Sequence, residues 1–121
     1  MRAAFAIWND RIAPQFDAAR QVCIVETRTG AIVHEHLEAF RSGLPVNKVR
    51  RLVELAVDTL VCGAISRPVQ ALLMAQGIRV VPFVAGTLPD VIQAWLQDGL
   101  ACQRFAMPGT AKEKTTDMNR R

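Results

Sequence analysis

The sequence predicts one α/β domain built around a mixed five-stranded sheet that is covered by helices. Three observations predict this class. Half of the 121 residues are apolar, short apolar runs alternate with amphipathic segments of helical period in the second half, and a hairpin signal lies in the first half. Strand–helix–strand connections give right-handed parallel crossovers, whereas a hairpin adds an antiparallel strand. A chain of this length has room for one hydrophobic core.

The first half of the chain predicts a buried strand followed by the hairpin. Residues 3–8 are wholly apolar, which is typical of a strand that is buried on both faces. A polar connection over residues 9–20 follows. Residues 22–25 and 31–33 then flank a turn in which Gly30 supplies a left-handed position, so we expect two antiparallel strands here.

The second half predicts helices and strands in alternation. Pro45 opens a helix in which apolar residues recur at i, i+3, i+4 and i+7 from Val49. The later elements are a strand at 59–62, a helix starting at Ser66-Arg67-Pro68, a strand at 78–81 and a helix starting at Thr87-Leu88-Pro89-Asp90.

Composition and charge exclude several classes of protein. The formal net charge of +4 is milder than the clustered basic footprint of a nucleic-acid binder, so we expect no nucleic-acid partner. No apolar run approaches the roughly 20 residues that span a bilayer, so we expect no membrane association and a cytoplasmic protein. We expect one cofactor-binding domain over residues 1–110 and a polar, disordered tail over residues 111–121.

The predicted ligand site lies at the carboxyl edge of the parallel strands, where the loops at 8–10, 62–67 and 85–87 should converge. Glycines allow close approach of a ligand, and helix amino termini offer free N–H groups to an anion. The alternative is that these residues only end and cap the elements. The candidate cofactor-binding residues are Asn9, Asp10, Cys62, Gly63, Ser66, Arg67, Gly86 and Thr87.

The three cysteines occur without a CxxC pair or a zinc-finger spacing, which disfavours a structural zinc site and a disulfide framework. Cys62 precedes a helix start, where the helix dipole and Arg67 would stabilise a thiolate and make it a candidate metal ligand. The alternative is a buried structural cysteine. Cys23 lies within a strand and is expected in the core, and Cys102 could be exposed or buried.

His34 and His36 are spaced i, i+2 on a predicted strand, so their side chains should share a face. Two imidazoles arranged in this way can bind one metal, and the alternative is a pair of solvent-facing residues on an edge strand. Asp10 and Asp17 bracket the first connection and suggest a metal-dependent nuclease, although loop acids of this kind are also simply solvated.

Other motifs exclude further chemistry. No Walker phosphate loop and no Ser/His/Asp nucleophile elbow is present. The modest basic cluster Arg41, Lys48, Arg50 and Arg51 is typical of a solvated helix face.

Five segments carry a resemblance that spans residues 3–109. They are Phe5–Ala19, which contains Ile-Ala-Pro-Gln-Phe-Asp-Ala-Ala, then Val61–Ser66, Gly77–Pro82, Val84–Gly86 and Phe105–Gly109. In these segments the chain resembles the dinitrogenase iron–molybdenum cofactor biosynthesis family, which includes the NifX and NafY accessory proteins and the carboxyl-terminal domain of NifB. Several relatives carry a cysteine directly after Met-Pro-Gly, where this chain has Thr110.

The resemblance implies a three-layer α/β/α ribonuclease-H-like fold with sheet order 3-2-1-4-5 and an antiparallel second strand. It also implies a carrier of an iron–sulfur cluster or iron–molybdenum cofactor precursor, not an enzyme. Cys62 would be a thiolate ligand, and Arg67 and the amides after Gly63 would balance the negative charge of the cluster. The partners would be nitrogenase cofactor-assembly proteins.

Two alternatives to a carrier are a sensor or interaction domain that binds a small anion and, less favoured, a metal-dependent nuclease. We expect a monomer or a weak homodimer, because the charged residues between His34 and Glu38 discourage uncontrolled edge pairing.

Overall fold

The computed structural model describes residues 1–98. The elements are β1 (Arg2–Trp8), β2 (Arg11–Ile12), the 3₁₀ turn η1 (Phe16–Ala18), β3 (Gln21–Arg28), β4 (Ala31–Ala39), α1 (Pro45–Glu54), β5 (Thr59–Val61), α2 (Arg67–Ala75), β6 (Arg79–Val81) and α3 (Leu88–Asp98). No helix within these residues is long and apolar enough to cross a membrane. The predicted tail, Cys102, Thr110 and the segment 105–109 lie outside the described residues.

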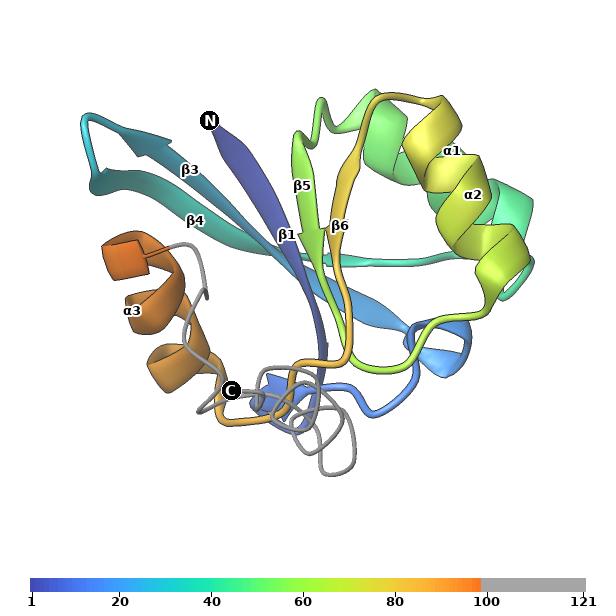
Figure 1. Ribbon diagram of the computed structural model, residues 1–121, viewed down its shortest axis with the longest axis horizontal. Helices are drawn as coiled ribbons and strands as arrows, with labels where there is room; N and C mark the ends of the chain where they lie inside the picture. Colours follow the sequence, from blue (N-terminus) through green and yellow to red (C-terminus); the bar gives the residue numbers. More distant parts are fainter. Residues whose placement is uncertain (99–121) are drawn as a thin grey trace, which may run out of the picture.

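The sheet is mixed, and the predicted α/β class is confirmed. Its path runs β4-β3-β1-β5-β6, with β3 antiparallel to both of its neighbours and β5 parallel to β1 and β6 (Figure 1). The sheet has six strands and not five, because β2 pairs with β1 off this path. The connection between them is a two-residue turn in which Asn9 and Asp10 have φ values of 51° and 62°. Left-handed backbone at both central positions is the geometry of a tight hairpin turn, to which Asn and Asp are suited.

The hairpin β3–β4 is longer than the apolar runs predicted. It spans Gln21–Arg28 and Ala31–Ala39, and Thr29 and Gly30 form its left-handed turn. The register shifts between Glu26 and Thr27, because Glu26 faces His34 whereas Thr27 faces Ile32. The polar half of β4 therefore belongs to the sheet, as its edge strand.

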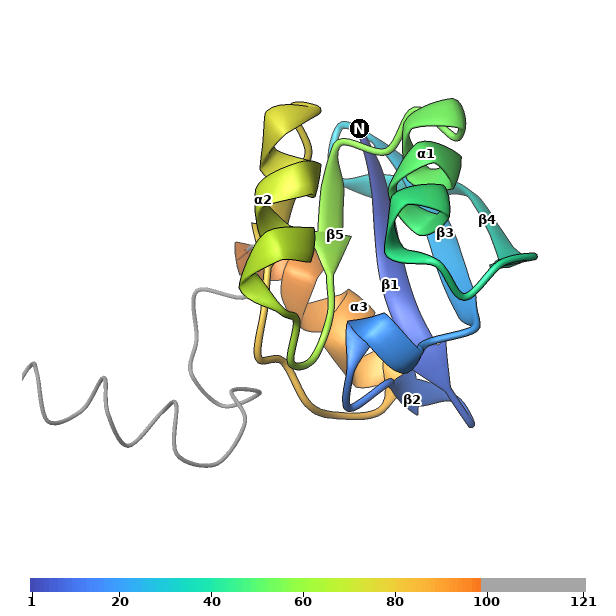
Figure 2. The same ribbon diagram turned by 90° about the vertical axis from the view of Figure 1, so that its right-hand side faces the viewer.

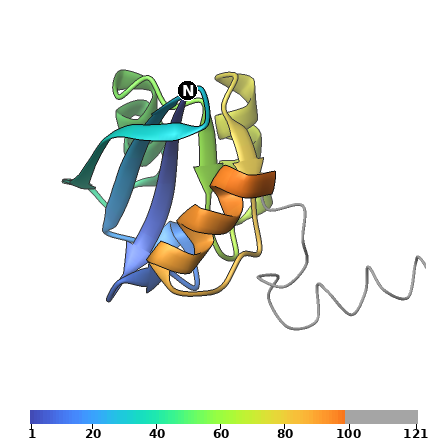
Figure 3. The same ribbon diagram turned by 90° about the vertical axis from the view of Figure 1, so that its left-hand side faces the viewer.

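Helices cover both faces of the sheet, and each face has its own core. Figure 3 shows α3 on one face and α1 and α2 on the other. Alternate residues of β1 point to opposite faces, so Ala4 and Ala6 pack beneath α1 and α2 while Phe5 packs beneath α3. The Phe5 ring meets the Trp95 ring edge to face, with 5.6 Å between centroids. The apolar run of β1 is buried from Ala3 to Ile7, as predicted.

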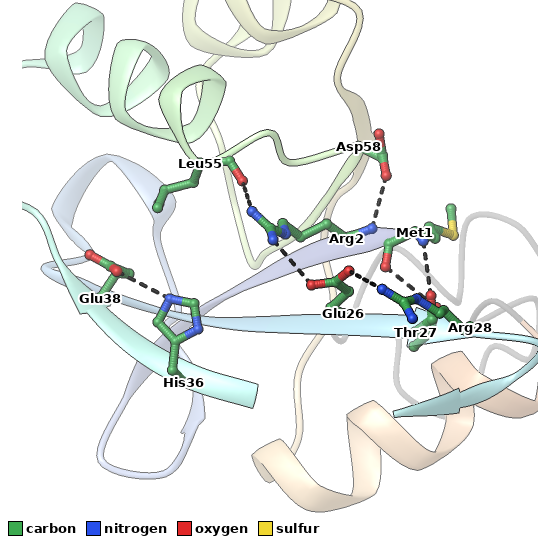
Figure 4. Close-up of polar contacts among 9 residues, drawn as sticks. All are labelled: Met1, Arg2, Glu26, Thr27, Arg28, His36, Glu38, Leu55 and Asp58. Atoms are coloured by element: carbon green, nitrogen blue, oxygen red, sulfur yellow. Dashed lines mark hydrogen bonds and ion pairs between the residues drawn. The ribbon is translucent and has the colours of Figure 1, made fainter. Parts of the chain in front are cut away.

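Arg2 fixes the start of β1 to the end of α1. Its guanidinium donates to the Leu55 carbonyl at 2.7 Å and pairs with Glu26 of β3 at 3.1 Å (Figure 4). Its backbone N–H donates to Asp58 at 2.8 Å. These contacts hold β3, and with it the neighbouring β4, in a defined position relative to α1.

Candidate metal-binding site

His34 and His36 lie on the same face of β4, as predicted, and their ring centroids are 5.1 Å apart. They stand opposite Glu26 and Ile24 of β3. Ile24 belongs to the core beneath α1 and α2, so the two imidazoles are on the α1 side of the sheet. Two imidazoles on one tetrahedral metal have centroids ~5 Å apart, given a metal–nitrogen distance of about 2.1 Å. The observed spacing matches this value.

Glu38 orients the His36 ring. Its Oε2 lies 3.1 Å from His36 Nε2 (Figure 4). Its Oε1 accepts a hydrogen bond from Arg51 of α1 at 2.9 Å. Hydrogen bonding from Arg51, together with its charge and a smaller effect of His36, lowers the pKa of Glu38 below its ordinary value. An ionised carboxylate can only accept hydrogen bonds, so His36 Nε2 must carry a proton.

The other ring nitrogen of His36 is the group that a metal would use. Among the described residues, His36 Nδ1 is buried and has no hydrogen-bond partner. In a neutral imidazole protonated on Nε2, this nitrogen bears the lone pair. A histidine whose second nitrogen is held by a carboxylate is the usual arrangement of a protein metal ligand. No group of three or more His, Cys, Asp or Glu within residues 1–98 could hold a metal, so the histidine pair would need further ligands from elsewhere.

A polar cavity of about 640 Å³ adjoins Glu38 between β4 and α1. Arg41, Arg50 and Arg51 contribute three cations to its lining, against the two carboxylates Glu38 and Glu54. Among the described lining residues the cations therefore exceed the carboxylates by one charge, and Arg51 is paired with both carboxylates, so Arg41 and Arg50 are the arginines available to a ligand. From the sequence alone, the same basic cluster is typical of a solvated helix face.

The loops at the carboxyl edge converge as predicted, but their backbones bond to one another. Ile12 N–H donates to the Gly86 carbonyl at 3.0 Å, and Leu88 N–H donates to the Asp10 carbonyl at 2.9 Å. On the neighbouring side, Ala64 N–H donates to the Pro14 carbonyl at 2.8 Å. The exposed Thr87 forms a bridge to Arg11. Many backbone groups that a ligand could have used are therefore already paired.

Cys62 does not face a shared mouth, so the predicted orientation of its side chain is wrong. It is 0 % exposed and belongs to the core beneath α1 and α2. Burial, reinforced by the Asp17 charge, raises the pKa of the Cys62 thiol to about 12. The environment therefore opposes the thiolate that a metal ligand requires. Cys23 is buried in the opposite core, as expected, and burial with the nearby Glu35 raises its pKa to about 12 as well.

Gly63 is required by protein packing. A Cβ at this position would lie 2.5 Å from the Ala13 and Pro14 carbonyl oxygens, which is too close for any side chain. The sequence predicts that Gly63 allows a ligand to approach the backbone closely. In the structure, the backbone of Ala13 and Pro14 occupies that space.

The amino terminus of α2 has a carboxylate partner from within the chain. Asp17 Oδ2 accepts a hydrogen bond from Ser66 Oγ at 2.8 Å, and Asp17 Oδ1 accepts one from Ser66 N–H at 3.3 Å. Ser66 makes no side-chain cap, in contrast to the prediction, because its hydroxyl donates to Asp17. Arg67 is the first helical residue and is exposed. Asp17 is engaged here, and Asp10 lies in the β1–β2 turn, so the two acids of the nuclease alternative serve different local structures.

Fold and site together define a small α/β domain with a histidine pair beside a cationic cavity. The profile of the dinitrogenase iron-molybdenum cofactor family matches residues 1–98, and the chain belongs to this family. Membership supports a role in iron–molybdenum cofactor biosynthesis. No curated protein sequence matches the chain.

Several solved structures share the fold. A protein from Methanocaldococcus jannaschii, proposed to be a dinitrogenase, has a TM-score of 0.67 and 16% identity, covering 84% of this chain and 92% of its own. A Thermotoga protein, proposed to be a NifB protein, has a TM-score of 0.63 and 22% identity over 89% and 98%. The apo form of the orange protein from Desulfovibrio gigas has a TM-score of 0.68 and 20% identity over 87% and 94%.

Proposed function

We propose that this protein is a carrier, and not an enzyme, that binds an iron–sulfur cofactor or an iron–molybdenum cofactor precursor during nitrogenase cofactor biosynthesis. The family match over residues 1–98 supports the pathway. The observation that carries the site is the buried Nδ1 of His36 beside His34, which has no hydrogen-bond partner among residues 1–98. Cofactor-assembly proteins of the cytoplasm would deliver and receive the cargo, and the carrier would act as a monomer or a weak homodimer on a ribonuclease-H-like scaffold.

Histidine ligation suits a cargo that must be released. Imidazole can replace thiolate as a ligand of iron–sulfur clusters. A neutral imidazole also needs no deprotonation near pH 7, whereas the Cys62 thiol, with its pKa raised by burial to about 12, would have to lose a proton inside the core. Two protein ligands leave the other metal positions free for a donor or acceptor protein.

The cationic cavity supports the same cargo. Cofactors built from thiolate- and sulfide-bridged iron are anionic, and the positive field of Arg41 and Arg50 would attract them to the histidine pair. Arg41 and Arg50 are exposed, so salt would screen their charges and we expect cargo binding to weaken at high salt.

Anaerobic reconstitution with iron and sulfide tests the proposal. Wild-type protein should develop sulfur-to-iron charge-transfer absorption, and the His34→Ala/His36→Ala variant should lose most of the bound iron. Leu37→Ala is the matched control, because Leu37 is exposed on the opposite face of β4 and should leave iron binding unchanged.

The same measurement distinguishes the carboxyl edge from the histidine pair. Cys62→Ala should retain the absorption. Loss of iron with Cys62→Ala but not with the histidine variant would instead place the cargo at the edge formed by Asn9, Asp10, Gly63, Ser66, Arg67, Gly86 and Thr87. A wild-type protein that stays colourless and free of iron would contradict the proposed function.

A further inference from the structure

Lys48 is a buried cation, although its position in the helical pattern predicts a solvated one. Its side chain is 2 % exposed, in the first turn of α1. The ammonium donates to the Phe16 carbonyl at 3.1 Å and to the Asp17 carbonyl at 2.7 Å, both in η1, which lies below α1 in Figure 2. It also lies 5.5 Å from the ring centroids of Phe16 and Phe40.

The charge of Lys48 has no ion-pair partner within the described residues. An ammonium carries three N–H groups, and the two carbonyls of η1 use two of them. Lysine is rarely buried unless it is paired, because the desolvation of an uncompensated charge is costly. Burial accordingly lowers the pKa of Lys48; Asp17 raises it and Arg20 lowers it further.

Lys48 lines a cavity whose charge is predominantly positive. The cavity has a volume of about 480 Å³ and is also lined by Arg20, Arg41 and Ser42. Asp17 is the single carboxylate that residues 1–98 contribute to its lining, and that carboxylate accepts hydrogen bonds from both donors of Ser66. Within the described part of the chain, three cations therefore line the cavity, and the one acid beside them already accepts hydrogen bonds.

We propose that this cavity binds an oxyanion group, held by Lys48 from inside and by Arg20 and Arg41 at the rim. Such a group supplies the missing counter-charge and accepts the third N–H of the buried ammonium. The inference goes beyond the proposed function, because neither His34 nor His36 lines this cavity, although Arg41 lines both it and the cavity beside Glu38.

The oxyanion could be a free ion or the head of a larger molecule. A neighbouring cavity of about 760 Å³ shares Ala18, Ala19, Arg20 and Phe40 with the cationic one, and its other walls are mostly apolar and include the exposed Trp8. An apolar body attached to the anion would fit there. Comparing inorganic phosphate with phenyl phosphate distinguishes the two sources, since only the second can use the apolar walls.

Isothermal titration calorimetry of the full chain with these two probes tests the proposal. Arg20→Gln and Arg41→Gln should each weaken phosphate binding by about tenfold or more, because each removes a charge-assisted hydrogen bond. Lys48→Met should abolish binding, and the two exposed arginines keep the test valid if that variant fails to fold. Tighter binding of phenyl phosphate would indicate a larger natural ligand, and equal binding a free ion.

Two controls separate this site from the others. Arg67→Gln removes the exposed cation at the start of α2, and His34→Ala/His36→Ala removes the proposed metal ligands; both should bind phosphate as wild type does. The proposal is overturned if the wild-type protein binds neither probe, if Arg20→Gln and Arg41→Gln leave the affinity unchanged, or if Arg67→Gln alone abolishes binding.

Discussion

The carboxyl edge of the sheet and the face formed by β4, α1 and η1 differ in how their polar groups are satisfied. At the edge, Asp17 engages Ser66, and backbone hydrogen bonds join the loops. On the β4–α1–η1 face, His36 Nδ1 lacks a partner and Lys48 lacks a counter-ion among the described residues.

This difference shows why the position of a loop in a familiar sheet does not by itself make a binding site. Both regions contain residue types that bind metals and anions. At the carboxyl edge, groups of this kind are paired with other groups of the chain. On the β4–α1–η1 face, His36 Nδ1 and the Lys48 ammonium are buried without full compensation by the described residues. Since an unpaired buried polar group costs free energy, a ligand gains most where such groups are found.

The largest expected effect is on the reactivity of the buried thiols. A reactive Cys62 would contradict the description of the carboxyl edge as closed. At pH 8, a pKa of about 12 makes the Cys62 thiolate about a thousandfold rarer than that of an ordinary thiol. In a Cys102→Ser background, native Cys62 and Cys23 should therefore resist alkylation by iodoacetamide, and both should react after unfolding. Rapid modification of native Cys62 would show that the carboxyl edge is open.

The next effect tests how tightly the edge loops are packed. Gly63→Ala should destabilise the protein by about 3 kcal/mol or more, because the new Cβ would overlap two carbonyl oxygens. Gly43→Ala is the control, since nothing lies within 4 Å of its added Cβ, and it should be neutral or stabilising by about 0.5 kcal/mol. Chemical denaturation measures both, and equal stability of the two variants would contradict the packing argument.

A smaller effect is expected for the contact between Asp17 and Ser66. Asp17→Ala and Ser66→Ala should each cost about 1 kcal/mol of unfolding free energy. The double variant should cost less than the sum of the two, because both substitutions remove the hydrogen bond from Ser66 Oγ to Asp17 Oδ2. Strict additivity would show that the hydrogen bond between the two side chains contributes nothing to stability.

The smallest expected effect is the dependence of stability on pH that the Arg51–Glu38 pair contributes on the β4–α1–η1 face. The pKa of Glu38 is lowered in the folded protein, chiefly by Arg51, so its contribution to stability is present above the ordinary pKa of 4.5 and is lost as pH falls through the lowered value. Glu38→Gln should therefore be less stable than wild type at pH 7, and the gap should close in acid. A gap that is constant between pH 7 and pH 3 would argue against the Arg51–Glu38 pair.

Much of the fold follows from the sequence, because the spacing of apolar residues indicates which side chains are buried and in which type of element. The apolar run at 3–8 and the stripe from Val49 gave a strand and a helix where the structure has β1 and α1. Strand β2 escaped prediction because two residues are too few for a periodic pattern, although Asn9-Asp10 is a hairpin-turn signal. The length of β4 was also not predicted. The strand lies at the sheet edge, where exposed polar residues do not show the apolar pattern of a buried strand.

The site was less predictable, because it depends on partners that are distant in sequence. The same-face position of His34 and His36 follows from strand geometry and is confirmed. The burial of Lys48 depends on carbonyls 31 and 32 residues away, and a helical pattern counts lysine as exposed. The pattern at the end of a strand does not show which way the last side chain points. The sequence alone therefore did not indicate that Cys62 lies in the core beneath α1 and α2.

The contact of Asp17 with the start of α2 has a consequence for any anion that approaches there. A carboxylate tethered within the same chain competes with it at an effective concentration on the order of millimolar or higher, whatever the dilution of the protein. Weakly binding anions in solution would lose this competition. The chain thus protects the start of α2 from adventitious anion binding with one of its own carboxylates.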